Sequence, residues 1–221
     1  MSRALDGAVE LLDRSLAYAR GTLADVTEAD LDRRTPCTAW TLRALLGHME
    51  DALDAFTEAA SGVVEVEPPP PALTRVDALR EKACALLAAW TRAARDDGRA
   101  TGDGRGPVAV GDAGLAGPVL VAAAALEITV HAWDVGRATG RGRALPDDLA
   151  RGLLAVAGVV VDPADRGVRF GPVRAVPDDA TYGAQLLAFL GRDPGPAGTG
   201  HLAGPPPPIS GEAGTPDGLA S

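Results

Sequence analysis

A carboxylate and an imidazole stand four residues apart in the most apolar stretch of the chain. Glu127 and His131 lie in LEITVHAWDVGRATG, directly after the run VLVAAAAL. Because an α-helix advances 3.6 residues per turn, the two side chains lie on one face, one turn apart, where they can contact a common ion. A buried unpaired carboxylate is costly, so the apolar surroundings predict a positive partner for Glu127. A divalent metal would satisfy both groups.

A third ligand has to come from another helix, and the chain has only three histidines. His48 lies in RALLGHMEDALDAF, in the apolar half of a predicted helix, where an imidazole needs a polar partner. Taken alone, it would be interpreted as a core histidine bonded to a backbone carbonyl. His201 lies in a stretch rich in Gly and Pro and is expected to be solvated. Together with Glu127 and His131, His48 favours a metal site of two histidines and one glutamate.

This ligand set is common for catalytic zinc, which keeps a fourth position open for water or substrate. Iron, nickel and manganese also accept it, so zinc is the expectation and the residue types do not name the metal. If the open position takes a thiol, the cation lowers the thiol pKa below its free value of about 8.5 and gives a nucleophile at neutral pH. If it takes water or a carbonyl oxygen, the metal acts as a Lewis acid for hydrolysis, elimination or cyclisation.

Two aspartates follow the predicted histidine ligands by three residues. Asp134 faces roughly the same way as His131, so it could orient the imidazole or carry a proton. An ion pair of Asp134 with Arg137 on the helix surface is equally compatible with the sequence. Asp51 has the same relation to His48, but its acidic neighbours favour a solvated face.

The cysteines and two of the tryptophans are expected to pack and to do no chemistry. Cys37 and Cys84 are far apart, and neither lies in a CxxC motif, so both are expected to be reduced, small buried hydrophobes. Trp40 and Trp133 are expected to be packing residues.

Hydrophobic periodicity predicts the elements that would carry these residues. Apolar residues recur at intervals of three and four, with Thr41 as a helix N-cap and Gly140 as a helix stop. The predicted helices lie at about residues 3–26, 42–61, 73–95, 118–139, 146–161 and 179–190. The stretch PVAV has room for one short strand, and the prolines at 68–71 predict an extended connector.

Composition and charge narrow the function classes. The chain of 221 residues suits one main domain. It is 46% hydrophobic but only 4% aromatic, so its core must consist chiefly of Ala, Leu and Val, which favours closely packed helices. A net charge of -9, with Lys82 as the only lysine, opposes a nucleic-acid partner. No signal peptide and no run of about 18 apolar residues is found, so a cytoplasmic protein without membrane contact is expected. The expected domain is 1–193, followed by a disordered tail at 194–221 that is rich in Gly and Pro.

Four motifs, TPCTAW, LLGHMEDAL, LEITVHAWDVGRATG and LLAFLGRDP, occur in an order that resembles the N-terminal domain family of mycothiol-dependent maleylpyruvate isomerases. The resemblance covers about residues 1–194. It implies the DinB-like metalloprotein fold, an all-α four-helix bundle with long crossover connections and short additional helices. It also implies that a histidine of the second helix and the acidic residue and histidine of a later helix hold the metal. Matched residue by residue, these are His48, Glu127 and His131.

The resemblance further implies a metal-dependent enzyme, a thiol S-transferase or isomerase that uses mycothiol or a related small thiol on a small electrophilic metabolite. Isomerisation of maleylpyruvate itself is not expected, because the isomerases carry an additional C-terminal domain that contributes to their active site. One alternative is a thiol-independent lyase, hydrolase or cyclase in a natural-product pathway. Another is a non-catalytic metal-binding or ligand-sensing domain. A small molecule is the expected partner, and a homodimer is compatible with the sequence.

Overall fold

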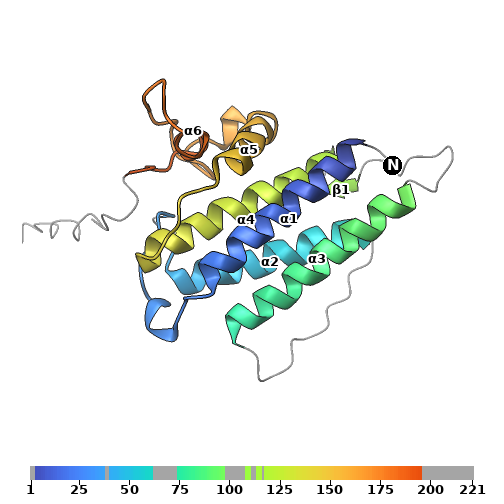
Figure 1. The fold of residues 1–221 in the computed structure, drawn as a ribbon, viewed down its shortest axis with the longest axis horizontal. Coiled ribbons are helices and arrows are strands. Elements are labelled where there is room, and N and C mark those ends of the chain that lie inside the picture. The colour runs from blue at the N-terminus through green and yellow to red at the C-terminus, as the bar shows by residue number, and fades with distance from the viewer. Residues whose placement is uncertain are drawn as a thin grey trace, which may run out of the picture.

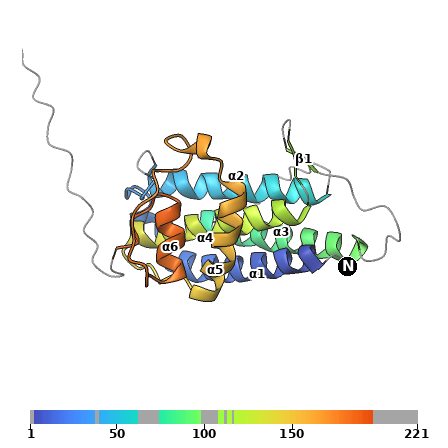
Figure 2. The same ribbon diagram turned by 90° about the horizontal axis from the view of Figure 1, so that it is seen from above.

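Four long helices lie side by side and form the body of the molecule (Figure 1). They are α1 (Arg3–Leu23), α2 (Leu42–Ser61), α3 (Arg75–Asp97) and α4 (Gly117–Thr139). Two shorter helices, α5 (Asp147–Val160) and α6 (Tyr182–Phe189), lie together on the α4 side of the bundle (Figure 2). The computed structural model describes residues 3–37, 40–61, 74–97, 108–110, 113–115 and 117–195. The predicted all-α bundle with short additional helices is confirmed.

The four long helices have the predicted crossover arrangement. α1 and α4 run in one direction and α2 and α3 in the other, so α2 ends and α3 begins at opposite ends of the bundle (Figure 1). α4 packs against α1 and α2, and α3 packs against the same two helices. Helices α1 and α4, which are far apart in sequence, therefore share a long interface.

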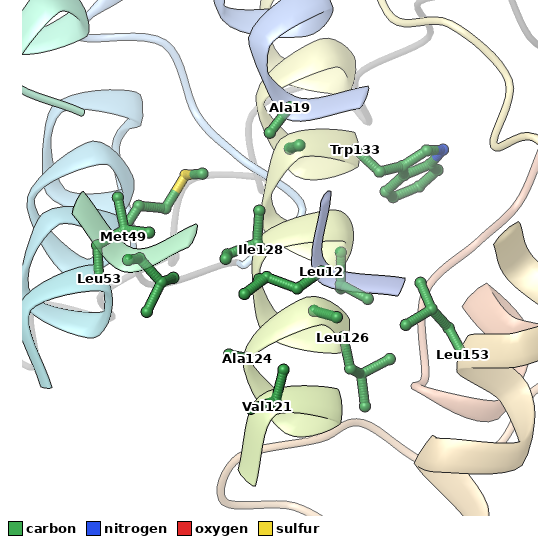
Figure 3. Packing of buried hydrophobic residues seen from close by; sticks show 14 of the residues in the cluster. Leu12, Ala19, Met49, Leu53, Val121, Ala124, Leu126, Ile128, Trp133 and Leu153 are labelled. Carbon is green, nitrogen blue, oxygen red and sulfur yellow. The ribbon is translucent and has the colours of Figure 1, made fainter. Parts of the chain in front are cut away.

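α4 is the central helix of the core. Most of its residues are buried, and Figure 3 shows Leu12 of α1, Leu53 of α2 and Leu153 of α5 reaching it from different sides. By length and composition alone α4 could cross a membrane, although Glu127 and Asp134 interrupt its apolar sequence. Most of its apolar window is nevertheless buried inside the protein, against the other helices. A polar group on α4 must therefore find its partner within the protein.

Short elements and caps fix the helix ends. Thr41 caps α2 through a hydrogen bond from the amide of Ala44, and Gly140, with φ of 71°, follows the last residue of α4; both predictions are confirmed. α1 ends three residues earlier than predicted. α6 begins three residues later, because the Thr181 hydroxyl accepts from the amide of Ala184 and starts the helix there.

The remaining elements are a hairpin and two single-turn 3-10 helices. The hairpin strands are β1 (Val108–Val110) and β2 (Ala113–Leu115), and the 3-10 helices are η1 (Glu28–Asp30) and η2 (Pro163–Asp165). β1 confirms the short strand expected in PVAV; β2 was not predicted. The proline connector at 68–71, the tail from 196 onward and His201 lie outside the described residues.

Two glycines hold the segment after α4 against that helix. A Cβ atom on Gly136 would lie 2.6 Å from the Cα atom of Gly142, so the two backbones can approach this closely only without side chains. The chain therefore turns back along α4 directly after its end.

We expect Gly136→Ala to lower the free energy of unfolding by about 2 kcal/mol, because backbone rather than a flexible side chain has to move. Gly7→Ala on α1, where nothing lies within 4 Å of the new Cβ atom, is the matched control and should raise it by about 0.5 kcal/mol. Urea unfolding of both variants tests this. Wild-type stability of Gly136→Ala would contradict the close approach.

A buried aspartate ties the α1–α2 connection to the end of α4. Asp30 accepts hydrogen bonds from Thr27 and pairs with Arg33 at 3.1 Å and with Arg141. Burial alone would raise the pKa of Asp30, but the hydrogen bonds from Thr27 and the guanidinium of Arg141 outweigh it and lower this pKa to about 2. The ionised form is thus strongly favoured in the folded state.

We expect Asp30→Asn to cost about 2 kcal/mol of stability near neutral pH. A carboxyl with a lowered folded-state pKa stabilises the fold above its unfolded pKa of about 4, so the difference from wild type should shrink as the pH falls from about 4 to about 2. Asp32→Asn, at an exposed carboxylate 3.7 Å from Arg43, should show no such dependence. A pH-independent cost of Asp30→Asn in urea titrations would count against the ionised pair.

Candidate metal centre

Two helices bring the three predicted ligands together. Nε2 of His48, on α2, lies 2.8 Å from Oε1 of Glu127, and Nε2 of His131 lies 3.0 Å from the same oxygen. All three ligand atoms lie within 4.8 Å of one another, so these residues could hold one metal ion. The two imidazole rings meet edge to face, with centroids 5.0 Å apart. The convergence expected from the sequence is present.

A pocket of about 630 Å³ opens onto these three side chains. Glu127 is only partly buried, between the buried residues Leu126 and Ile128, because it faces this pocket. Trp40 forms one wall, with its ring centroid 4.7 Å from that of His48, so it does more than pack in the core. The segment around Phe170, between α5 and α6, contributes a further part of the lining.

Asp134 is fully buried behind His131. Its Oδ2 atom lies 3.0 Å from Nδ1 of His131, which leaves Nε2 of that ring facing Glu127. The predicted alternative, a surface pair with Arg137, is wrong: the Arg137 guanidinium lies over the ring of Trp133, 5.4 Å from its centroid. A carboxylate on the far nitrogen is the usual way to fix a metal-binding histidine, so Asp134 is placed to orient His131.

Comparison with known proteins places the chain in a family. The sequence model of the mycothiol maleylpyruvate isomerase N-terminal domain matches residues 12–136. The chain belongs to this family. It is also 32% identical over 147 residues to two proteins of Mycobacterium tuberculosis, Uncharacterized protein MT0763 of strain CDC 1551 / Oshkosh and Uncharacterized protein Rv0738 of strain ATCC 25618 / H37Rv. Each alignment covers 66% of this chain and 74% of the relative. No solved structure matches the chain.

The site extends beyond the family match to Arg192, which sequence reasoning missed. Arg192 follows α6, and its side chain is only 11% exposed. Its Nη2 atom lies 2.8 Å from Oδ2 of Asp134 and its Nε atom 3.0 Å from Oδ1. The guanidinium therefore donates hydrogen bonds to both carboxylate oxygens. Two signals were available: Arg192 directly follows the apolar run LLAFLG, and it lies in the motif LLAFLGRDP that contributes to the family resemblance.

Cys37 also belongs to this cluster. Its Sγ atom lies 3.4 Å from Oδ2 of Asp134 and 3.6 Å from Nη2 of Arg192. Cys37, His131 and Asp134 form a second group with metal-ligand spacing. A cation there would lie against the Arg192 guanidinium, and like charges repel. The geometry therefore favours the group that contains His48.

Opposite charges favour the ionised forms of Glu127, His131 and Asp134. Burial would raise the pKa of Glu127, but hydrogen bonds from His131 and His48 outweigh it and hold this pKa well below its usual range. Burial would also lower the pKa of His131, but Asp134, Cys37 and Glu127 together hold it well above the usual value. The pKa of Asp134 is lowered despite burial, by His131 and Arg192. Every ionised group of the cluster thus faces an opposite charge.

Asp51 and Cys84 lie away from this cluster. Asp51 is exposed on α2 and is not among the described residues that line the pocket. Cys84, expected to be buried, is exposed. It stands two residues before the buried Leu86, and residues two apart lie on nearly opposite sides of a helix.

We expect Arg192→Ala to lower the free energy of unfolding by about 3 kcal/mol, because it leaves the buried Asp134 carboxylate without its guanidinium. The double variant Arg192→Ala/Asp134→Asn removes that stranded charge and should recover part of the loss. Urea unfolding of the single and double variants tests the pair. A double variant no more stable than Arg192→Ala would contradict this account.

Proposed function

We propose that His48, Glu127 and His131 hold a divalent metal, zinc in the first instance, in an enzyme that acts on a small electrophilic metabolite with mycothiol or a related thiol. The observation that carries the proposal is the convergence of three ligand atoms from two helices at a pocket. Two nitrogens and one carboxylate oxygen are a ligand set typical of catalytic zinc. When bound, the metal supplies a Lewis acid that lowers the pKa of a thiol or a water molecule.

The surrounding side chains support this role. Asp134 holds the His131 ring through Nδ1, so that Nε2 is directed to the metal position. Arg192 neutralises Asp134 and keeps that carboxylate from competing as a ligand. Trp40 and Phe170 give the pocket apolar walls, which exclude water and present a surface to an apolar part of a substrate. Membership of the mycothiol-related family supports the choice of thiol.

We expect purified protein to bind zinc, and His48→Ala and His131→Ala each to weaken the affinity at least about 100-fold, since each removes a ligand. Asp51→Asn, at an exposed acid one turn from His48, is the matched control and should bind like wild type. Isothermal titration calorimetry and elemental analysis give the affinity and the stoichiometry. Full metal retention in both histidine variants would refute the site.

Thiol use is tested separately on the metal-loaded protein. We expect mycothiol and a soluble electrophile to give a conjugate at a rate that chelation of the metal abolishes. If mycothiol neither binds nor forms a conjugate, the thiol part of the proposal fails.

A thiol-independent lyase, hydrolase or cyclase is the second candidate, because the same pocket and ligand set suit water or a carbonyl oxygen in the open position. Metal-dependent turnover without a thiol would favour it. Metal binding without any turnover would instead favour a metal-binding or ligand-sensing domain.

A further inference from the structure

A second pocket, of about 480 Å³, lies at the C-terminal end of α4. The segment that turns back after Gly140, the first turn of α6 and the segments at 35–36 and 194–195 form the rest of its lining. Among the described residues, Pro36 lines both this pocket and the pocket at His48. None of the three proposed metal ligands lines the second pocket. It is thus a separate cavity, and we call it the arginine pocket after Arg137 and Arg143, which line it.

The arginine pocket is positively charged in an acidic protein. Its described lining includes two arginines and no acidic residue, although the chain carries a net charge of -9. Within the described part of the chain, neither Arg137 nor Arg143 forms an ion pair. The nearby Asp193 carboxylate instead accepts a hydrogen bond from the amide of Gly195. By contrast, Arg141, between the two, pairs with Asp30.

The rest of the lining suits an apolar group. Leu145, Ala184 and Leu187 contribute aliphatic surface. The Thr181 hydroxyl accepts a hydrogen bond from the amide of Ala184, which leaves its own hydrogen available to donate to a ligand. Ligand pockets typically combine such apolar walls with a few polar groups that fix orientation.

We infer that the arginine pocket binds a small organic anion, with its carboxylate or phosphate on Arg137 and Arg143 and its apolar body against Leu145 and Leu187. Guanidinium groups match both anions in geometry and in charge, and their hydrogen bonds to such groups are among the strong ones. The inference does not depend on the metal or on the thiol, because the two pockets have separate charged groups.

The tryptophans allow the two pockets to be observed separately. Trp133 lines the arginine pocket and Trp40 lines the pocket at His48. Trp90 is buried in the bundle, with its indole nitrogen bonded to the carbonyl of Phe56, and serves as an internal reference. Fluorine NMR of the full chain labelled with 5-fluorotryptophan therefore gives one signal for each pocket and one for the bundle interior. The signals are assigned by replacing each tryptophan in turn with phenylalanine.

Benzoate, phenyl phosphate and neutral benzamide are the probes. We expect at least one of the anions to shift the Trp133 signal saturably, and benzamide not to do so. Arg137→Gln and Arg143→Gln should each weaken that affinity about tenfold, since each removes one charge-assisted contact. Arg151→Gln, an exposed arginine on α5, is the matched control and should leave it unchanged. The ratio of the two anion affinities shows whether the pocket prefers carboxylate or phosphate.

Three results would overturn the inference. One is the absence of a saturable shift of the Trp133 signal with either anion. Another is a shift that survives both arginine substitutions at wild-type affinity. The third is a response confined to the Trp40 signal, which would place the anion in the pocket at His48. Arg143→Gln keeps the test decisive even if Arg137→Gln disturbs its contact with Trp133, because the Arg143 residue is exposed.

Discussion

The burial of charge on α4 constrains how the rest of the chain packs. Glu127, His131 and Asp134 project from a helix that other helices enclose, and each would be costly without a partner. His48 on α2 and Arg192 after α6 supply those partners. Apolar packing alone tolerates rearrangement, whereas these contacts require one position of α2 and one path of the chain beyond α6. The polar cluster thus fixes the relative positions of the helices, and the leucines and alanines pack the space between them.

The parts of the structure that depend on local spacing could be predicted from the sequence. The i, i+4 relation of Glu127 and His131 holds in any α-helix, and the scarcity of histidines left few candidates for a third ligand. Thr41 also acts within a few residues of its own position. Arg192 could not be predicted in the same way, because its partner lies 58 residues earlier and only the tertiary fold brings them together.

The two pockets are close neighbours with a common wall. The segment at 35–37 contributes Cys37 to the pocket at His48 and Thr35 to the other. The segment at 192–195 is divided in the same way, with Arg192 on one side and Gly195 on the other. Both dividing segments also touch the carboxylate of Asp134, through Cys37 and Arg192. The two segments that separate the pockets therefore also contact Asp134, the residue that orients His131.

The late position of Arg192 in the chain has a consequence for biosynthesis. A ribosome releases α1 to α4 first, so His48, Glu127 and His131 emerge while the guanidinium that neutralises Asp134 is still to be made. During that interval the side of α4 that α5 covers is bare and its buried aspartate lacks this partner. Completion of the site thus coincides with completion of the fold. A prematurely terminated chain would carry all three proposed ligands and still lack the contact that secures their arrangement.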